Sequence, residues 1–73
     1  MNEIKENLVN YLEAHQISNI NDLNSIATHY LKSKFERDSV SSSFNAFGRE
    51  VHYSFVIPET GELTNLTISL DEI

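Results

Sequence analysis

Three histidines are the side chains of this sequence best suited to metal binding or proton transfer. His15 lies on the apolar stripe of a predicted helix, His29 points away from the stripe of a second one, and His52 lies on the polar face of a predicted strand. The chain has no cysteine, and no carboxylate stands at metal-ligand spacing from any of the three. The sequence therefore predicts ordinary histidines, with no metal site and no cofactor.

Two carboxylates, Glu59 and Glu62, flank the Thr60-Gly61 turn, and paired carboxylates do acid–base work where burial keeps one of them protonated. A hairpin tip is exposed to water, so we interpret this pair as solvated turn charges. The sequence has no G-x-S-x-G segment, and its two glycines are too few for a phosphate-binding glycine loop. We predict that the protein is not an enzyme.

The net charge of −6 is distributed unevenly along the chain. Residues 1–31 carry four carboxylates and one lysine, residues 32–49 carry four basic and two acidic side chains, and residues 50–73 carry only acidic ones. A phosphate backbone is repelled by the whole chain and attracted only by its middle segment. The acidity either keeps a small domain in solution or faces a basic partner.

These charges define two candidate contact surfaces. The acidic candidate consists of the carboxylates of residues 50–73, which are Glu50, Glu59, Glu62, Asp71 and Glu72. The basic candidate consists of the cations of the middle segment, which are Lys32, Lys34, Arg37 and Arg49. The first three cations also fall in the last turns of a predicted helix, where they complement the negative end of the helix dipole, and contact with phosphate is the alternative role.

Helical spacing of apolar residues in the first half of the chain predicts the elements that position these side chains. We expect helices over about residues 3–15 and 20–37, with Asn2 and Asn19 as N-caps and Asp22 completing a short capping box. No Gly or Pro interrupts residues 20–37, so one helix is expected there. The two apolar stripes are Ile4, Leu8, Tyr11, Leu12 and His15, and Leu23, Ile26, Ala27, Tyr30, Leu31 and Phe35.

Alternating apolar residues in the second half predict three strands, over about residues 40–47, 50–58 and 63–70. With Gly48-Arg49 and Thr60-Gly61 as two-residue hairpin loops, almost all apolar side chains of this half share one face. The first loop pairs Val40 with Ile57, Ser42 with Phe55, Phe44 with Tyr53 and Ala46 with Val51. The second loop pairs Ile57 with Thr64, Phe55 with Leu66, Tyr53 with Ile68 and Val51 with Leu70.

The expected architecture is a single α+β domain over residues 1–73, a two-layer sandwich in the order ααβββ. An N-terminal helical hairpin packs on a three-stranded antiparallel meander, whose other face is polar and nearly uncharged, with Phe47 and Val56 as its large apolar groups. The outer strands contain no Lys, Pro or inward charge, which are the usual protections against edge pairing. We therefore expect an edge to pair with a target or with a second copy, and we favour a homodimer.

Composition also predicts where the protein works. The chain has no cysteine and no long apolar run, and its first residues include Glu3 and Glu6. These features predict a cytoplasmic protein without a signal peptide or a membrane span.

We expect a non-enzymatic acidic module that binds a protein target and so inhibits or modulates a larger macromolecule. One version is a DNA mimic, in which the acidic candidate replaces phosphates on a nucleic-acid-binding protein. Small acidic proteins of phages and mobile elements, including anti-CRISPR inhibitors, provide the analogy. Two alternatives stay open: a nucleic-acid-binding transcriptional regulator that uses the basic candidate, which the net charge disfavours, and a self-assembling structural component.

Overall fold

Two helices precede a three-stranded antiparallel sheet in the computed structural model, which describes residues 3–44 and 48–73. The helices are α1 (Glu3–Glu13) and α2 (Ile20–Lys34), and the strands are β1 (Ser41–Phe44), β2 (Glu50–Ile57) and β3 (Glu62–Ser69). Two 3-10 turns, η1 (Arg37–Ser39) and η2 (Leu70–Glu72), precede β1 and follow β3. This arrangement confirms the predicted α+β fold in the order ααβββ.

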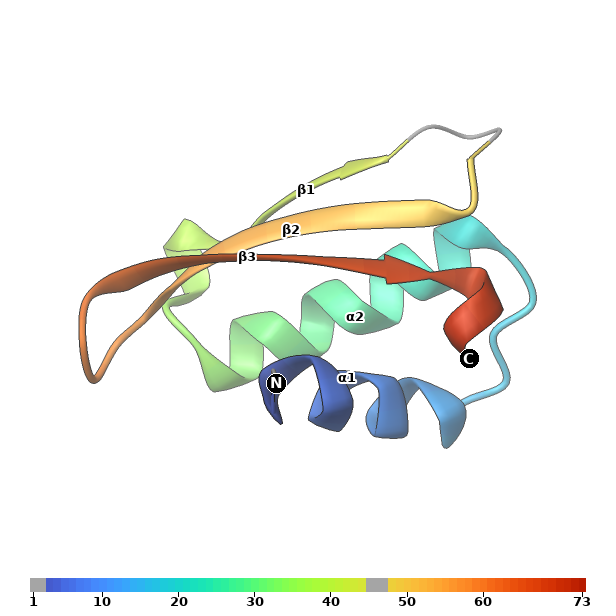
Figure 1. Ribbon diagram of the computed structural model, residues 1–73, viewed down its shortest axis with the longest axis horizontal. Helices are drawn as coiled ribbons and strands as arrows, with labels where there is room; N and C mark the ends of the chain where they lie inside the picture. The colour runs from blue at the N-terminus through green and yellow to red at the C-terminus, as the bar shows by residue number, and fades with distance from the viewer. Residues whose placement is uncertain (1–2, 45–47) are drawn as a thin grey trace.

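Both helices lie against the same face of the sheet (Figure 1), where α2 packs on β1 and β2 while α1 packs on α2 and β3. Apolar side chains from both layers meet between them and exclude water, which is the main source of stability in a domain of this size. The buried residues are Leu8, Leu12, Ile20, Leu23, Ala27, Leu31, Val51, Tyr53, Phe55, Leu66 and Ile68. Ala46, which was predicted to join them, lies outside the described residues.

α2 begins where the sequence predicts, because Asn19 caps it. Asn19 has an extended backbone, and its Oδ1 accepts the Asp22 backbone N–H at 2.9 Å. The Asp22 carboxylate accepts a hydrogen bond from the Ser18 hydroxyl at 3.0 Å. The cap therefore satisfies an N–H group that has no partner within the helix.

Replacing Asn19 by alanine should lower the free energy of unfolding by about 1 kcal/mol, because the Asp22 N–H loses its acceptor. Urea denaturation followed by circular dichroism measures this loss. Asn19→Asp should keep most of the stability, and Asn21→Ala, at an exposed position in the same turn, should change it by less than about 0.5 kcal/mol. Equal losses for the Asn19 and Asn21 alanine variants would contradict the capping role.

α2 ends three residues earlier than predicted, because β2 offers competing backbone partners. The N–H of Phe35 still donates to Leu31 O at 2.9 Å, but the next N–H, of Glu36, donates to Val56 O of β2 at 3.2 Å. The hydroxyl of Ser39 then accepts the Val56 N–H at 2.8 Å. Residues 36–39 are therefore tied to the sheet, and the prediction that the helix reaches residue 37 is wrong.

Both hairpins differ from the predicted register by two residues. Phe44 lies opposite Val51, and Val51 lies opposite Ile68. The predicted pairings, which placed Phe44 opposite Tyr53 and Val51 opposite Leu70, are therefore wrong. Since side chains alternate between faces with a period of two, a shift of two keeps every side chain on its predicted face. For this reason the predicted apolar face is confirmed although the register is not.

The second turn differs because Pro58 starts it. A four-residue loop, Pro58 to Gly61, separates the paired residues Ile57 and Glu62. The proline ring fixes a φ angle suited to the second position of a tight turn, and Ile57 O accepts the N–H groups of Thr60 at 3.2 Å and Gly61 at 2.7 Å. Gly61 has φ +72°, a conformation that glycine adopts without steric cost.

In the first hairpin, the bonds of Glu36 and Ser39 to Val56 anchor β1 in its observed register.

A half-buried polar cluster joins α2 to the central strand. The Tyr53 hydroxyl donates to Asn24 Oδ1 at 3.1 Å, and the Thr28 hydroxyl donates to the same oxygen at 3.2 Å. Burial raises the pKa of Tyr53 to about 12. The cluster lets a tyrosine occupy the core without an unsatisfied hydroxyl.

Candidate functional site

The acidic candidate forms two groups, because the β2–β3 ladder separates its members. Glu59 lies in the loop between these strands and Glu62 is the first residue of β3, whereas Glu50 is the first residue of β2 at the opposite end. Seven residue steps separate the two ends, or about 23 Å at about 3.3 Å per step. The hairpin group is Glu59 and Glu62, and the terminal group is Glu50, Asp71 and Glu72.

Cations neutralise most of the terminal group. Asp71 Oδ1 accepts hydrogen bonds from Arg49, at 3.0 Å from Nε and 2.7 Å from Nη2. Glu72 Oε2 lies 3.0 Å from Lys5 Nζ of α1. The hydrogen bond and the positive charge of Arg49 lower the pKa of the Asp71 carboxyl and raise that of Arg49 itself. Both pairs are exposed, so they determine the local charge more than the stability.

The basic candidate is likewise divided. Lys32 and Lys34 lie in the last turn of α2 and Arg37 in η1, near the sheet end formed by the β2–β3 loop, while Arg49 lies at the other end (Figure 1). A hollow of about 140 Å³ is lined by His29, Lys32, Ser33 and Arg37. Glu36 and Asp38 flank Arg37 in the sequence, so the local charge is mixed.

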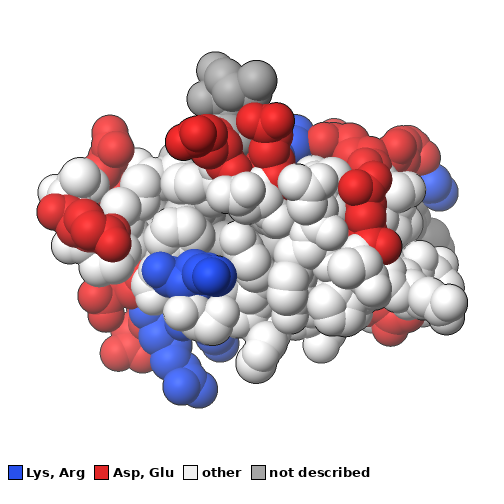
Figure 2. Space-filling view, turned by 90° about the horizontal axis from the view of Figure 1, so that it is seen from below, with Lys and Arg blue, Asp and Glu red and all other residues white. Residues whose placement is uncertain are grey.

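Figure 2 shows the helical side of the molecule. Carboxylates follow its upper margin and its left end, lysine and arginine lie mainly on its left half, and its centre is uncharged. Basic side chains therefore lie on this face itself, left of its centre, while carboxylates lie mostly at its margins.

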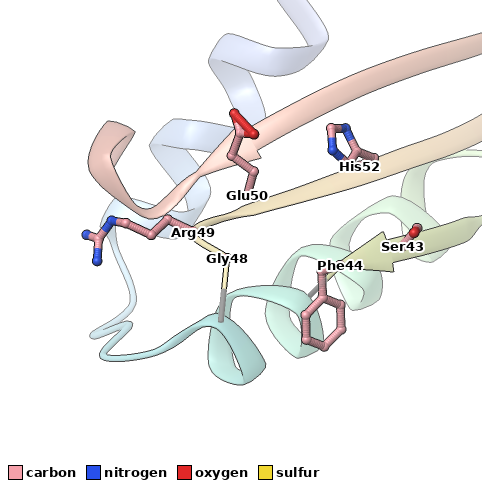
Figure 3. Close-up of a pocket in the computed structure, with 6 residues that line it drawn as sticks. All are labelled: Ser43, Phe44, Gly48, Arg49, Glu50 and His52. Carbon is pink, nitrogen blue, oxygen red and sulfur yellow. The ribbon is translucent and has the colours of Figure 1, made fainter. Parts of the chain in front are cut away.

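A second hollow, of about 340 Å³, lies beside the β1–β2 connection and is lined by Ser43, Phe44, Gly48, Arg49, Glu50 and His52. In Figure 3, Glu50 and His52 rise on the same side of β2, whereas Phe44 points to the opposite side and Arg49 extends away. His52 Nδ1 lies 2.8 Å from Thr67 Oγ1, so it already has a hydrogen-bond partner on β3. The lining residues do not converge on a point where a reacting atom would sit.

The three histidines lie on separate elements: His15 follows α1, His29 is on α2 and His52 is on β2. Over residues 3–44 and 48–73, no three His, Cys, Asp or Glu side chains gather where they would hold one metal ion. The expectations that the protein is not an enzyme and uses no metal or cofactor stay predictions.

The open face of the sheet is polar, as predicted, and its side chains bond across strands. Ser41 and Ser54 share a hydroxyl hydrogen bond of 2.9 Å, and His52 bonds to Thr67. Val56 and Leu63 lie opposite each other on this face. Leu63 is 63% exposed and is the large hydrophobic residue that stands out on the surface of the described chain. Val56 was predicted on this face and Leu63 was not, although Leu63 stands at an odd-numbered strand position like Asn65 and Thr67 and so shares their face.

β3 is an edge strand, since the strand order is β1-β2-β3. The Leu70 N–H donates to Arg49 O at 2.8 Å, which shows that its backbone faces β2. Backbone groups alternate in direction along an antiparallel strand, so those of every second residue counted back from Leu70 also face β2. The intervening residues Leu63, Asn65 and Thr67 direct their N–H and C=O groups outward. The next outward N–H, of Ser69, donates to Glu72 Oε1 at 3.1 Å. Within residues 3–44 and 48–73, no strand pairs with these groups, so a row of outward backbone donors and acceptors runs from Leu63 to Thr67.

The opposite edge is described over a shorter stretch. Its described strand residues are Ser41–Phe44, and the positions that follow, 45–47, lie outside the described residues, whereas all eight residues of β3 are described. Both edges were predicted to be unprotected, and we take β3 as the candidate template because its outward backbone groups can be assigned along the whole strand.

Comparisons with protein-family models, curated proteins and solved structures gave no match. None of the described helices is long and apolar enough to cross a membrane.

Proposed function

We propose that this chain is a non-enzymatic, acidic protein-binding module that works in the cytoplasm and modulates a larger macromolecule. An extended segment of the target adds to the outer edge of β3, so that backbone hydrogen bonds supply affinity and the side chains of the open face supply specificity. The observation that carries this proposal is the outward backbone row from Leu63 to Thr67, which has no strand partner in the described part of the chain, with the exposed Leu63 at its start. An uncovered edge of this kind is a template for strand pairing.

The DNA-mimic version has weaker support than the general one. A mimic needs a row of free carboxylates, but the hairpin and terminal groups lie at opposite ends of the ladder. Asp71 and Glu72 are also held in ion pairs with Arg49 and Lys5. Within residues 3–44 and 48–73, the hairpin group and Glu50 are the members of the acidic candidate that form no ion pair, and they stand at opposite ends of the ladder.

The test uses proline to remove one outward N–H from each edge. The N–H of Asn65 on β3 faces outward, so Asn65→Pro removes a donor to the target without breaking a bond to β2. Ser42→Pro is the matched control on β1, where alternation directs the N–H outward too. We expect Asn65→Pro to abolish binding to targets captured from nuclease-treated lysate, while Ser42→Pro binds normally and both variants stay folded.

Amide hydrogen exchange supplies the second readout. Binding should slow exchange at Leu63, Asn65 and Thr67 and leave Ser42 unchanged. Full binding by folded Asn65→Pro, or no stoichiometric protein retained at low salt, would contradict the proposal. Retention of nucleic acid would instead favour the transcriptional regulator. A second copy is the competing occupant of the edge, and it would appear as a dimer in sedimentation that Asn65→Pro dissociates.

A further inference from the structure

The two ends of the β3 edge differ in charge. Glu62, the first residue of β3, and Glu59 in the adjoining loop are exposed, and neither forms an ion pair within residues 3–44 and 48–73. At the other end, the carboxylates that follow β3 are Asp71 and Glu72, and each is paired with a cation. A strand lying along this edge therefore meets uncompensated negative charge at one end only.

Glu50, the remaining member of the terminal group, does not cancel this difference. It belongs to β2, so an added strand would lie two strand spacings from it, about 10 Å, but only about 5 Å from Glu62. Exposed charges are largely screened over about 10 Å at 0.1 M salt. The field along the edge is thus dominated by Glu62.

Apolar surface marks the same end. Leu63, next to Glu62, is 63% exposed and lies across the ladder from Val56 on the open face. An apolar side chain on an adjacent strand would cover Leu63 and remove its surface from water. Toward the other end, the edge presents the polar side chains of Asn65 and Thr67.

We infer that the segment recognised by β3 is an antiparallel strand whose C-terminal end carries an apolar residue beside Leu63, followed by Lys or Arg beside Glu62. The antiparallel direction is inferred because the whole sheet is antiparallel and such ladders are slightly more stable than parallel ones. The inference rests on the proposed function of β3 and adds the polarity and the charge of its partner.

The test attaches the partner strand to the protein itself. An eight-residue tail, TVTVTVKK, is appended after Ile73 through a flexible Gly/Ser linker of roughly six residues, which makes even weak pairing observable. The matched tail TVTVTVEE differs only in the sign of its terminal charges. Exchange of the Leu63, Asn65 and Thr67 amides reports pairing, with thermal unfolding as a second readout.

We expect the Lys tail to protect these amides roughly tenfold more than the Glu tail, the ratio given by reversing one unit charge at about 5 Å in a watery environment. The preference should reverse in Glu62→Lys and persist in Glu50→Lys, the matched control on β2. It should shrink in 1 M salt.

Two other sets of results would count against the inference. Equal protection by both tails, or no reversal in Glu62→Lys, would overturn the charge inference and leave strand addition at β3 standing. If neither tail protected these amides in the parent, in Glu62→Lys or in Glu50→Lys, both this inference and the proposed function would be overturned.

Discussion

Replacing Phe55 by alanine should lower the free energy of unfolding by about 3–5 kcal/mol, the usual loss for a buried phenylalanine. Phe55 is fully buried in the central strand, and its ring stacks on Phe35, which ends α2, with centroids 4.6 Å apart and an interplanar angle of 27°. Truncation removes this contact and leaves a cavity between the layers. A chain of 73 residues has a total stability of roughly 4–11 kcal/mol, so a large part of it would be lost.

Thermal unfolding followed by circular dichroism measures this effect, and we expect the Tm of Phe55→Ala to fall by more than about 10 °C. Leu63→Ala is the matched control, because it truncates an exposed apolar side chain and should change stability by less than about 0.5 kcal/mol. If Phe55→Ala does not fold at all, the milder Phe55→Leu should still lose stability. A Tm within a few degrees of the parent would refute the central role of Phe55. Leu63→Ala should show the opposite behaviour, with normal stability and weakened target binding.

Alkaline pH should destabilise the protein through Tyr53. Burial raises the pKa of Tyr53 to about 12 in the folded chain, while an unfolded tyrosine titrates near 10. Below pH 10 the hydroxyl is protonated in both states, so the stability is unaffected. Between about pH 10 and 12 only the unfolded chain loses the proton, and the free energy of unfolding falls by about 2–3 kcal/mol.

Urea denaturation at pH 8 to 11.5 measures this loss, and Tyr53→Phe identifies its source. The variant should be less stable by about 1 kcal/mol at pH 8, because Asn24 Oδ1 loses a donor, yet its stability should decline less as the pH rises. Tyr30→Phe, which keeps Tyr53, should retain the alkaline loss of the parent. An identical pH dependence in Tyr53→Phe and the parent would show that Tyr53 is not responsible.

Local pattern was enough to predict the fold class and the division of side chains between core and surface. Leu8 and Leu12 lie one helical turn apart, and Val51, Tyr53 and Phe55 alternate along one strand, so each set shares a face whatever the rest of the chain does. The N-cap Asn19 was predictable for the same reason, since its hydrogen bond joins residues only three apart.

The candidate site was less predictable, because it depends on contacts between distant segments. The net charge indicated an acidic surface, but the order of charged residues in a sequence does not show which of them lie together in the folded chain. Arg49 and Asp71, assigned to different surfaces, form one ion pair 22 positions apart. Leu63 became a candidate only once its exposure and its position opposite Val56 were known.

By itself, then, the sequence determined the order ααβββ, the faces of its elements and the start of α2, because these depend on residues within a few positions of each other. The tertiary structure decided the strand register, the end of α2 and the charge of each sheet end. Periodicity is unchanged by a two-residue shift, so it cannot select the register. Among the described residues, the Pro58 turn and the bonds of Glu36 and Ser39 to Val56 do so. The β3 edge is open because the two helices pack on one face of the sheet, and in the described parts of the chain no strand lies along the outer side of β3.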